Sequence, residues 1–203
     1  MPIAMARPRS EDKRNAILQA AIAEFAARGV WHTPTSAISK AAGVAEGTLF
    51  TYFASKDELV NALYRQLKGE LAERMLAGHP AGEGVATVKA GFGHVFKTYV
   101  HWGAANPARF KVMTQLKHSD RVTAESRAAG MAAFGPLGDA AQQAIAQGVL
   151  RPLPFDFLCA LLGGMAEATM GFVATAKPGD PDHAEAAFEV FWRGIVMPAG
   201  SGA

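Results

Sequence analysis

Residues 33–53 read TPTSAISKAAGVAEGTLFTYF, and this stretch decides the fold. Its opening Thr-Pro pair is typical of a helix start, and Gly43 is typical of the left-handed residue that ends a short helix. A second short helix follows the glycine. Ile38 would pack the first helix and Leu49 would turn inward from the second, so the pattern predicts a helix-turn-helix.

Helix-sized segments continue on both sides of this stretch, and we find no convincing run of alternating β-branched residues that would indicate a strand. A helix is expected from about Ser10 to Arg28, and a capping box over residues 55–58 opens a longer helix that Gly78 ends. Further helices are expected near 83–104, 107–117, 120–147 with a kink at Gly135-Pro136, 157–174, and 187–195. The sequence therefore predicts an all-α fold.

Composition sets limits on the class of protein. The chain has 203 residues, of which 50% are hydrophobic and 19% charged, which excludes disordered and disulfide-rich classes. A single cysteine, Cys159, fits a reducing cytoplasm, and the N-terminal basic residues follow a short apolar patch, the reverse of the order in a signal peptide. Residues 1–56 hold seven Lys and Arg against four Asp and Glu, so the modest basic excess belongs to the helix-turn-helix region. We expect a cytoplasmic protein.

Residues 42–59, AGVAEGTLFTYFASKDEL, resemble the signature of the TetR family (TetR/AcrR) of transcriptional regulators. That signature has Ala-Gly-Val, then Gly-Thr-Leu-aromatic, then Tyr or His before Phe, and a lysine just inside the next helix. The resemblance implies about nine helices, with a three-helix DNA-binding domain at residues 1–55 and a larger effector-binding and dimerisation domain at 56–203. It also implies repression that a small molecule relieves.

The resemblance assigns several residues to DNA. Thr35, Tyr52 and Lys56 match positions that hold phosphates, and Thr33 is a further hydroxyl donor because Pro34 replaces a common threonine. The positions that match the groove-facing surface of the second helix are Ala45, Glu46, Gly47, Thr48, Phe50 and Thr51. Glu46 suits a cytosine amino group and Phe50 a thymine methyl. Many relatives have tyrosine at the Phe50 position, so a phosphate bond from that position is lost here.

Alternatives stay open for these residues. Tyr52 and Phe53 would serve equally as core aromatics, Lys56 as a solvated residue at a helix start, and Glu46 as an acid that suits the first turn of a helix. The N-terminal basic residues fit either contact with the DNA backbone or minor groove, or a solvated arm; they are Arg7, Arg9, Lys13 and Arg14.

Methionines and aromatics are frequent beyond residue 80. Such stripes are usually core, but the family places an apolar effector in a cavity of this region, and Met with aromatics suits such a pocket. The candidate lining residues are Phe92, Phe96, Tyr99, Trp102, Phe110, Met113, Met131, Phe134, Met165 and Glu167. Glu167 lies in an apolar helix and needs a polar partner, which a ligand, Arg193, a histidine or a dimer mate would supply.

The last two long helices are the candidate interface of a homodimer, because small residues there allow close helix approach and aromatics supply apolar area. The segment 157–174 approaches the length of a membrane span, but Glu167 near its middle and the lack of flanking aromatic or basic belts argue against one. A two-fold dimer would bind a pseudo-palindromic operator in double-stranded DNA.

The alternative function is a helical ligand-binding protein or an enzyme with a vestigial DNA-binding head. His94 and His101 lie seven residues apart, but no acid or cysteine joins them at metal-ligand spacing, and neither HExxH nor GxSxG occurs. We expect no catalytic residue, metal or cofactor, and we interpret the sequence as that of a DNA-binding regulator.

Overall fold

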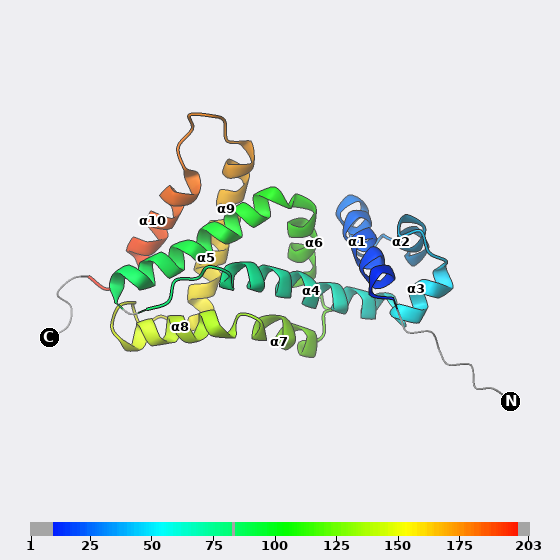
Figure 1. The fold of residues 1–203 in the computed structure, drawn as a ribbon, viewed down its shortest axis with the longest axis horizontal. Coiled ribbons are helices and arrows are strands. Elements are labelled where there is room, and N and C mark those ends of the chain that lie inside the picture. Colours follow the sequence, from blue (N-terminus) through cyan, green and yellow to red (C-terminus); the bar gives the residue numbers. More distant parts are fainter. Residues whose placement is uncertain (1–9, 83, 199–203) are drawn as a thin grey trace. The chain divides into compact units, whose positions relative to one another are not determined.

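The computed structural model describes residues 10–82 and 84–198, which form ten α-helices (Figure 1). The helices are α1 Glu11–Arg28, α2 Thr35–Ala41, α3 Glu46–Tyr52, α4 Lys56–Leu76, α5 Val85–Ala105, α6 Pro107–Lys117, α7 Ala124–Ala132, α8 Gly135–Ala146, α9 Phe155–Thr175 and α10 His183–Ile195. An isolated antiparallel bridge joins Leu150 to Val196. The predicted all-α class is confirmed over the described residues.

The chain divides into two compact units. Unit 1 is Met1–Leu67 with Ala108–Ala129, and unit 2 is Lys68–Pro107 with Gly130–Ala203. The helix α4 therefore contributes its first part to unit 1 and its last part to unit 2. The functional division into residues 1–55 and 56–203 stays a prediction.

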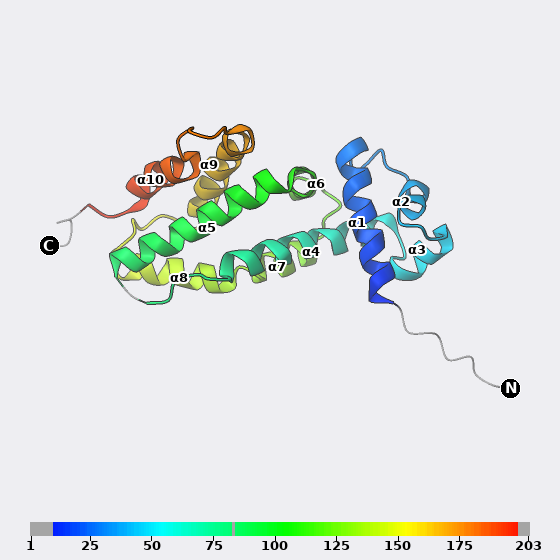
Figure 2. The same cartoon turned by 45° about the horizontal axis from the view of Figure 1, so that its top comes forward.

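The core of unit 1 forms where α1, α2 and α3 meet (Figure 2). Ile17, Ala21 and Phe25 are fully buried because their spacing of four residues places them on one face of α1. Ile38 of α2 and Leu49 of α3 are also fully buried. Each large apolar side chain buried in this way stabilises the fold by about 1.5–3 kcal/mol, and this core fixes α3 against its neighbours.

The segment that carries α6 belongs to unit 1 through hydrogen bonds from side chains to the backbone around the end of α1. The ammonium group of Lys111 donates to the carbonyl of Ala26 at 2.7 Å. The side-chain oxygen of Gln115 accepts from the N–H of Val30 at 3.2 Å. A part of the chain far beyond the helix-turn-helix in sequence is therefore tied to it.

In unit 2, α5 packs against both α9 and α10 (Figures 1 and 2). Two glycines of α5 make this close approach possible. A Cβ at Gly93 would lie 3.0 Å from the ring of Phe188, and a Cβ at Gly103 would overlap the side chain of Met170. The aromatic and thioether side chains of α9 and α10 thus rest directly on the backbone of α5.

The helix α9 has 21 residues and is, by length and composition alone, apolar enough to cross a membrane. Only 22% of its most apolar stretch is buried, and Phe157 and Phe172 are among its exposed side chains. A core or interface helix of a soluble protein passes the same test. The helix α9 therefore keeps apolar side chains at the surface of this chain.

Two details differ from the sequence-based expectation. The helix expected over 120–147 is two helices, α7 and α8, because Pro136 falls in the first turn of α8, where its missing N–H needs no partner. Similarly, α2 begins at Thr35, and Pro34 precedes the helix in an extended conformation. The break at Gly135-Pro136 is thus a helix boundary instead of a kink.

Candidate nucleic-acid interface

A tight turn joins α2 to α3. Gly43 has a φ of +67°, a conformation that L side chains rarely adopt, and the N–H of Val44 donates to the carbonyl of Ser39 at 3.0 Å. Ile38 and Leu49 pack inward from the two helices. The helix-turn-helix that the sequence predicts is therefore present, with α3 in the position of a recognition helix.

The outer face of α3 is made of small and medium side chains. The predicted groove-facing residues that are exposed are Ala45, Glu46, Gly47, Phe50 and Thr51, while Thr48 is half-buried. Phe50 keeps 43% of its surface exposed, although its ring is apolar. The hydroxyl of Thr51 donates to the carbonyl of Gly47 at 3.0 Å, so it is satisfied within the helix. This face allows the helix backbone to approach a major groove closely.

A groove of about 530 Å³ runs along the same side of unit 1. We call it the helix-turn-helix groove, and the residues that line it are Trp31, His32, Thr33, Pro34, Thr35, Phe50, Ala54, Ser55 and Lys56. It brings together predicted phosphate-binding residues from the start of α2 and the start of α4 with Phe50 of α3. The structure thus gathers on one surface residues that the sequence places 21 positions apart.

Thr35 and Glu46 are joined by a hydrogen bond at the edge of this groove. The hydroxyl of Thr35 donates to Oε1 of Glu46 at 2.9 Å. Thr35 is the first residue of α2 and Glu46 the first residue of α3. A predicted phosphate contact and a predicted base contact are therefore directly connected.

Tyr52 lies at the end of α3 and reaches back to α1. Its hydroxyl accepts the backbone N–H of Ser10 at 2.9 Å. The side chain is half-buried, and the guanidinium of Arg14 lies 5.7 Å from the ring centre of the adjacent Phe53. Tyr52 is thus both a link within unit 1 and a surface hydroxyl.

Lys56 opens α4, where Ser55 and Glu58 of the predicted capping box both bind the backbone, although Glu58 accepts the N–H of the residue before Ser55. The hydroxyl of Ser55 accepts the N–H of Glu58 at 3.1 Å, and the carboxylate of Glu58 accepts the N–H of Ala54 at 2.7 Å. The ammonium group of Lys56 donates to the carbonyl of Trp31 at 3.2 Å. This arrangement holds the cation at the helix-turn-helix groove.

The surroundings of Lys56 disfavour the charged form of its side chain. Partial burial lowers the pKa of Lys56, the nearby guanidinium of Arg121 lowers it further, and the carboxylate of Asp57 acts in the opposite direction. The repulsion between two cations held close together is offset when an anion binds beside them. A DNA phosphate is such an anion, which suits the role that the sequence predicts for Lys56.

Thr33 is a correction to the predicted set of DNA contacts. Its side chain is 0% exposed, and its hydroxyl donates to the carbonyl of Gly29 at 2.8 Å. The residue forms the buried floor of the helix-turn-helix groove and fixes the chain between α1 and α2. Because the hydroxyl is satisfied in the core, Thr33 does not offer a donor to DNA.

The sequence model for bacterial regulatory proteins of the tetR family matches residues 17–63, from α1 into α4. The crystal structure of a TetR family transcription regulator from Marinobacter aquaeolei is similar with a TM-score of 0.83 and 25% identity, covering 94% of this chain and 99% of that one. The chain belongs to the TetR family. It is therefore a DNA-binding transcriptional regulator, of a family whose members are not enzymes.

Other relatives extend this comparison. A tetR family transcription regulator from a Shewanella species is similar with a TM-score of 0.81 and 26% identity, covering 93% of this chain and 100% of that one. The fatty acid metabolism regulator protein of Bacillus subtilis is 37% identical over 59 residues, 29% of this chain and 30% of that protein. The Bacillus subtilis FadR structure in complex with stearoyl-CoA shares the fold, with a TM-score of 0.70 and 20% identity over 90% of this chain and 99% of that one.

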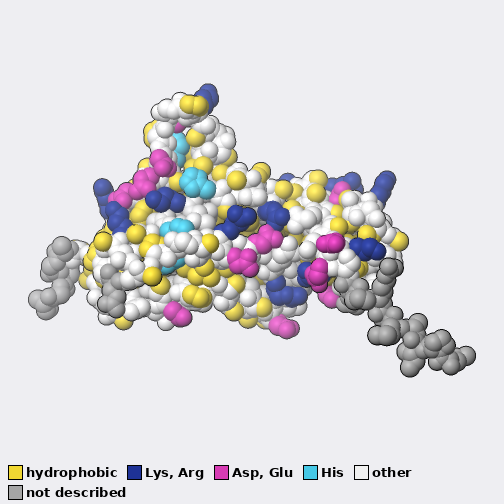
Figure 3. All heavy atoms as spheres, viewed as in Figure 1, with side chains coloured by type: hydrophobic (Ala, Val, Ile, Leu, Met, Phe, Trp, Pro, Cys, Tyr) yellow, Lys and Arg dark blue, Asp and Glu magenta, His cyan; other side chains and the backbone are white. Residues whose placement is uncertain are grey.

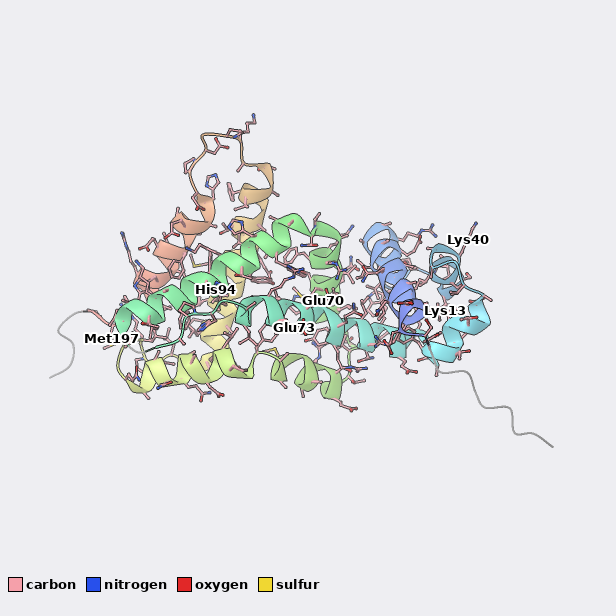
Figure 4. All side chains as sticks on the ribbon, viewed as in Figure 1. Lys13, Lys40, Glu70, Glu73, His94 and Met197 are labelled. Carbon is pink, nitrogen blue, oxygen red and sulfur yellow. The ribbon has the colours of Figure 1, made fainter. Side chains whose placement is uncertain are left out.

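Sequence reasoning missed several residues of this TetR-family surface. Trp31 and His32 line the helix-turn-helix groove, and the guanidinium of Arg121 lies 5.3 Å from the ring centre of Trp31. Lys40 is exposed at the end of α2 and points away from the helix (Figure 4). The signal that would have found Lys40 is its place one turn beyond Thr35 and Ser36 on a short helix of the motif.

Both signs of charge occur on the face of the protein drawn in Figure 3, where basic and acidic side chains are interspersed. The predicted arm residues Arg7 and Arg9 lie outside the described residues. Of the same set, Lys13 is exposed and Arg14 is half-buried, so Lys13 is the one better placed to reach a phosphate.

Most of the aromatic candidates for an effector site belong to packed clusters. Phe96 is fully buried and lies 6.0 Å, between ring centres, from both Phe188 and Phe191 of α10. Phe92 lies 6.5 Å from Trp192 in the same way. These contacts support the alternative that Phe92 and Phe96 are core residues between α5 and α10.

The remaining candidates do not form one group. Phe110 and Met113 lie on α6 in unit 1, whereas the other candidates belong to unit 2. Met131 is exposed. The ammonium group of Lys68 lies 4.6 Å from the ring centre of Phe134. The set of ten residues is thus divided between the two units, and an effector site made of these residues stays a prediction.

Glu167 finds a partner that the sequence analysis did not name. The hydroxyl of Tyr99 donates to Oε1 of Glu167 at 3.2 Å and links α5 to α9. Burial, and next the negative charge of Glu167, raise the pKa of Tyr99 well above its ordinary value, so the phenol keeps its proton. The pair provides a polar contact between α5 and α9.

Of the two histidines on α5, His94 packs against another ring. The ring of His94 lies edge-on to that of His79, with 6.2 Å between ring centres, and a Cβ at Gly91 would lie 2.9 Å from His79. His101 is exposed. Among residues 10–82 and 84–198, no three His, Cys, Asp or Glu side chains are grouped in a way that could hold a metal ion.

Proposed function

We propose that this regulator is a repressor that binds a pseudo-palindromic operator as a homodimer and is released by a small apolar effector. The observation that carries the proposal is the helix-turn-helix groove, where Thr35, Phe50 and Lys56 share one exposed surface. DNA binding follows from membership of the TetR family. The mode of control and the effector are the parts that we propose. A cytoplasmic location follows from this activity.

The contacts divide into two kinds on this surface. Tyr52 and Lys56 bind backbone phosphates and set the register of the protein on the duplex. The exposed face of α3 enters the major groove, where Glu46 accepts from a base amino group and Phe50 contacts a thymine methyl. Since the basic excess near the motif is modest, phosphate attraction alone gives weak binding.

Dimerisation supplies the remaining affinity through α9 and α10. Phe172 of α9 and Val190 of α10 keep 61% and 66% of their surfaces exposed, and α9 leaves most of its apolar stretch uncovered. A second copy that packs the same two helices against them covers this surface without placing Glu167 in lipid. Two recognition helices then lie about 34 Å apart and bind successive major grooves.

The effector class to test first is a long-chain acyl-CoA, in which the acyl chain is the apolar part and the CoA group is polar. The FadR structure from Bacillus subtilis contains stearoyl-CoA, and the fatty acid metabolism regulator of the same organism shares sequence with this chain. In unit 2 the part-buried Tyr99–Glu167 pair and the buried Thr169 place polar groups among apolar side chains. An acyl chain suits such surroundings because its burial is driven by the hydrophobic effect.

Selection of genomic DNA fragments by the purified protein tests this function. We expect enrichment of a motif with two inverted half-sites, and loss of the complex when stearoyl-CoA is added while free CoA leaves it intact. Reporter expression from the selected promoter should rise when the regulator gene is deleted. Recovery of no sequence preference contradicts the operator, and a fall in reporter expression on deletion contradicts repression.

A further inference from the structure

The hydrogen bond between Thr35 and Glu46 connects the first residues of the two helices of the motif. Thr35 lines the helix-turn-helix groove and Glu46 is exposed on α3. The residues that immediately precede them, Pro34 and Ala45, have no side-chain acceptor. The side-chain hydrogen bond between the starts of the two helices is therefore made by their first helical residues, through the threonine hydroxyl and the glutamate carboxylate.

The chemistry of a hydroxyl limits what Thr35 does on DNA. A threonine hydroxyl has one proton to donate, and this proton is directed at Oε1 of Glu46, at 2.9 Å. It is not available to a phosphate at the same time. A carboxylate beside Thr35 also repels a phosphate at that point, so the hydroxyl is poorly arranged for a backbone contact.

The same hydrogen bond leaves the carboxylate of Glu46 able to recognise a base. A carboxylate has two oxygens, so a bond to Oε1 leaves Oε2 able to accept from a base. A free glutamate side chain loses rotamer freedom when it is fixed, and this loss opposes binding. A bond that already holds Glu46 in the unbound protein removes part of that loss.

We propose that Thr35 is a positioning residue that sets base preference by holding Glu46 for a cytosine amino group, instead of a phosphate contact. The inference rests on the proposed operator binding. Cytosine presents an amino donor in the major groove, whereas guanine and thymine present carbonyl oxygens that repel a carboxylate. Phe50 follows Glu46 by four residues and lies on the same face of α3, which places both on the surface that enters the groove.

The test compares Thr35→Val with the wild-type protein on the operator that selection yields. One set of operator variants changes, one at a time, each base pair of a half-site. The position read by Glu46 is defined as the one at which Glu46→Gln changes preference. At that position we expect Thr35→Val to reduce the preference for the cognate base by about tenfold, with little change in preference elsewhere.

Two further variants complete the design. Thr35→Ser keeps the hydroxyl and should keep the preference, and Thr35→Val should add little in a Glu46→Gln background because the two residues act together. Thr98→Val on α5 is the matched control, since it loses the same hydroxyl outside the motif. Thr35→Ala removes the same donor and serves if the valine variant does not fold.

The outcomes separate this inference from the function on which it rests. Equal weakening on every operator variant would make Thr35 a phosphate contact and overturn the inference alone. Unchanged preference in both Thr35→Val and Thr35→Ala overturns it as well. A wild-type protein that enriches no DNA sequence overturns the proposed function, and this inference with it.

Discussion

The hydroxyl of Tyr52 accepts the backbone N–H of Ser10 at 2.9 Å, across 42 residues of sequence. Because the phenol oxygen is the acceptor in this bond, its own proton remains available to donate. The start of α1 and the end of α3 are therefore joined by a side chain that still offers an O–H. A phosphate of the DNA backbone is a suitable acceptor for it.

Replacement of Tyr52 by phenylalanine should weaken operator binding at every operator variant by about 1.5–3 kcal/mol per subunit, since each subunit loses one hydrogen bond to a charged phosphate. Fluorescence anisotropy with the selected operator and its base-pair variants measures this. Tyr64→Phe is the control because Tyr64 is buried in α4 away from the predicted contacts. An unchanged affinity in Tyr52→Phe would show that the hydroxyl only links the helices.

Replacement of Lys56 by glutamine should reduce both affinity and its dependence on salt. Each phosphate neutralised by a cation contributes about 0.9 to the slope of log K against log salt, so two subunits should lose about 1.8. Titrations at several salt concentrations give the slope, and Lys177→Gln, an exposed lysine between α9 and α10, should leave it unchanged. A slope unaltered in Lys56→Gln would place the ammonium away from phosphates.

The local pattern of the motif carried most of what could be predicted about the fold. Spacing of apolar residues and the turn at Gly43 placed α2 and α3, because these features act within a few residues of each other. The break between α7 and α8 was expected only as a kink, since Pro136 is compatible with either. Attachment of α6 to unit 1 depends on long-range bonds such as that of Lys111, which no local pattern encodes.

For the candidate site, too, the sequence predicts local features and misses those that depend on packing. Which residues lie on the outer face of α3 follows from helical periodicity, and Glu46 and Phe50 are on it. The burial of Thr33 was not predictable, because a threonine before a proline serves equally well as a cap or as a core hydroxyl. The bond between Tyr99 and Glu167 joins residues 68 apart, and only the packing of α5 on α9 brings them together.

Stability should fall as the solution is acidified, in part through His79. Burial, and next the charge of His94, lower the pKa of His79, so the unfolded chain takes up this proton at a higher pH than the folded protein. Stability from the neutral ring is therefore complete above about pH 6.5 and is lost as the pH falls below that value and through the lower pKa of the folded protein. Urea unfolding from pH 7.5 to 5.5 measures the loss.

The matched control for this prediction is a histidine on the same helix as His94. His79→Gln should make unfolding free energy less dependent on pH, whereas His101→Gln, which changes an exposed ring, should keep the wild-type dependence. An equal pH dependence in both variants would assign the acid loss to other groups.

The uncovered surface of α9 and α10 gives the last prediction, which concerns assembly. Phe172→Glu and Val190→Glu place a charge on the exposed apolar surface of these helices, and burying an unpaired carboxylate in an interface costs several kcal/mol. Both variants should sediment as monomers at concentrations where the wild-type protein is a dimer. They should also bind a single half-site no worse than the wild-type protein does, because α3 is unchanged.

Met131→Glu alters an exposed apolar residue outside α9 and α10 and should remain dimeric. A dimer that survives both substitutions on α9 and α10 would move the interface elsewhere, and the spacing expected between operator half-sites would have to be derived again from that new two-fold axis.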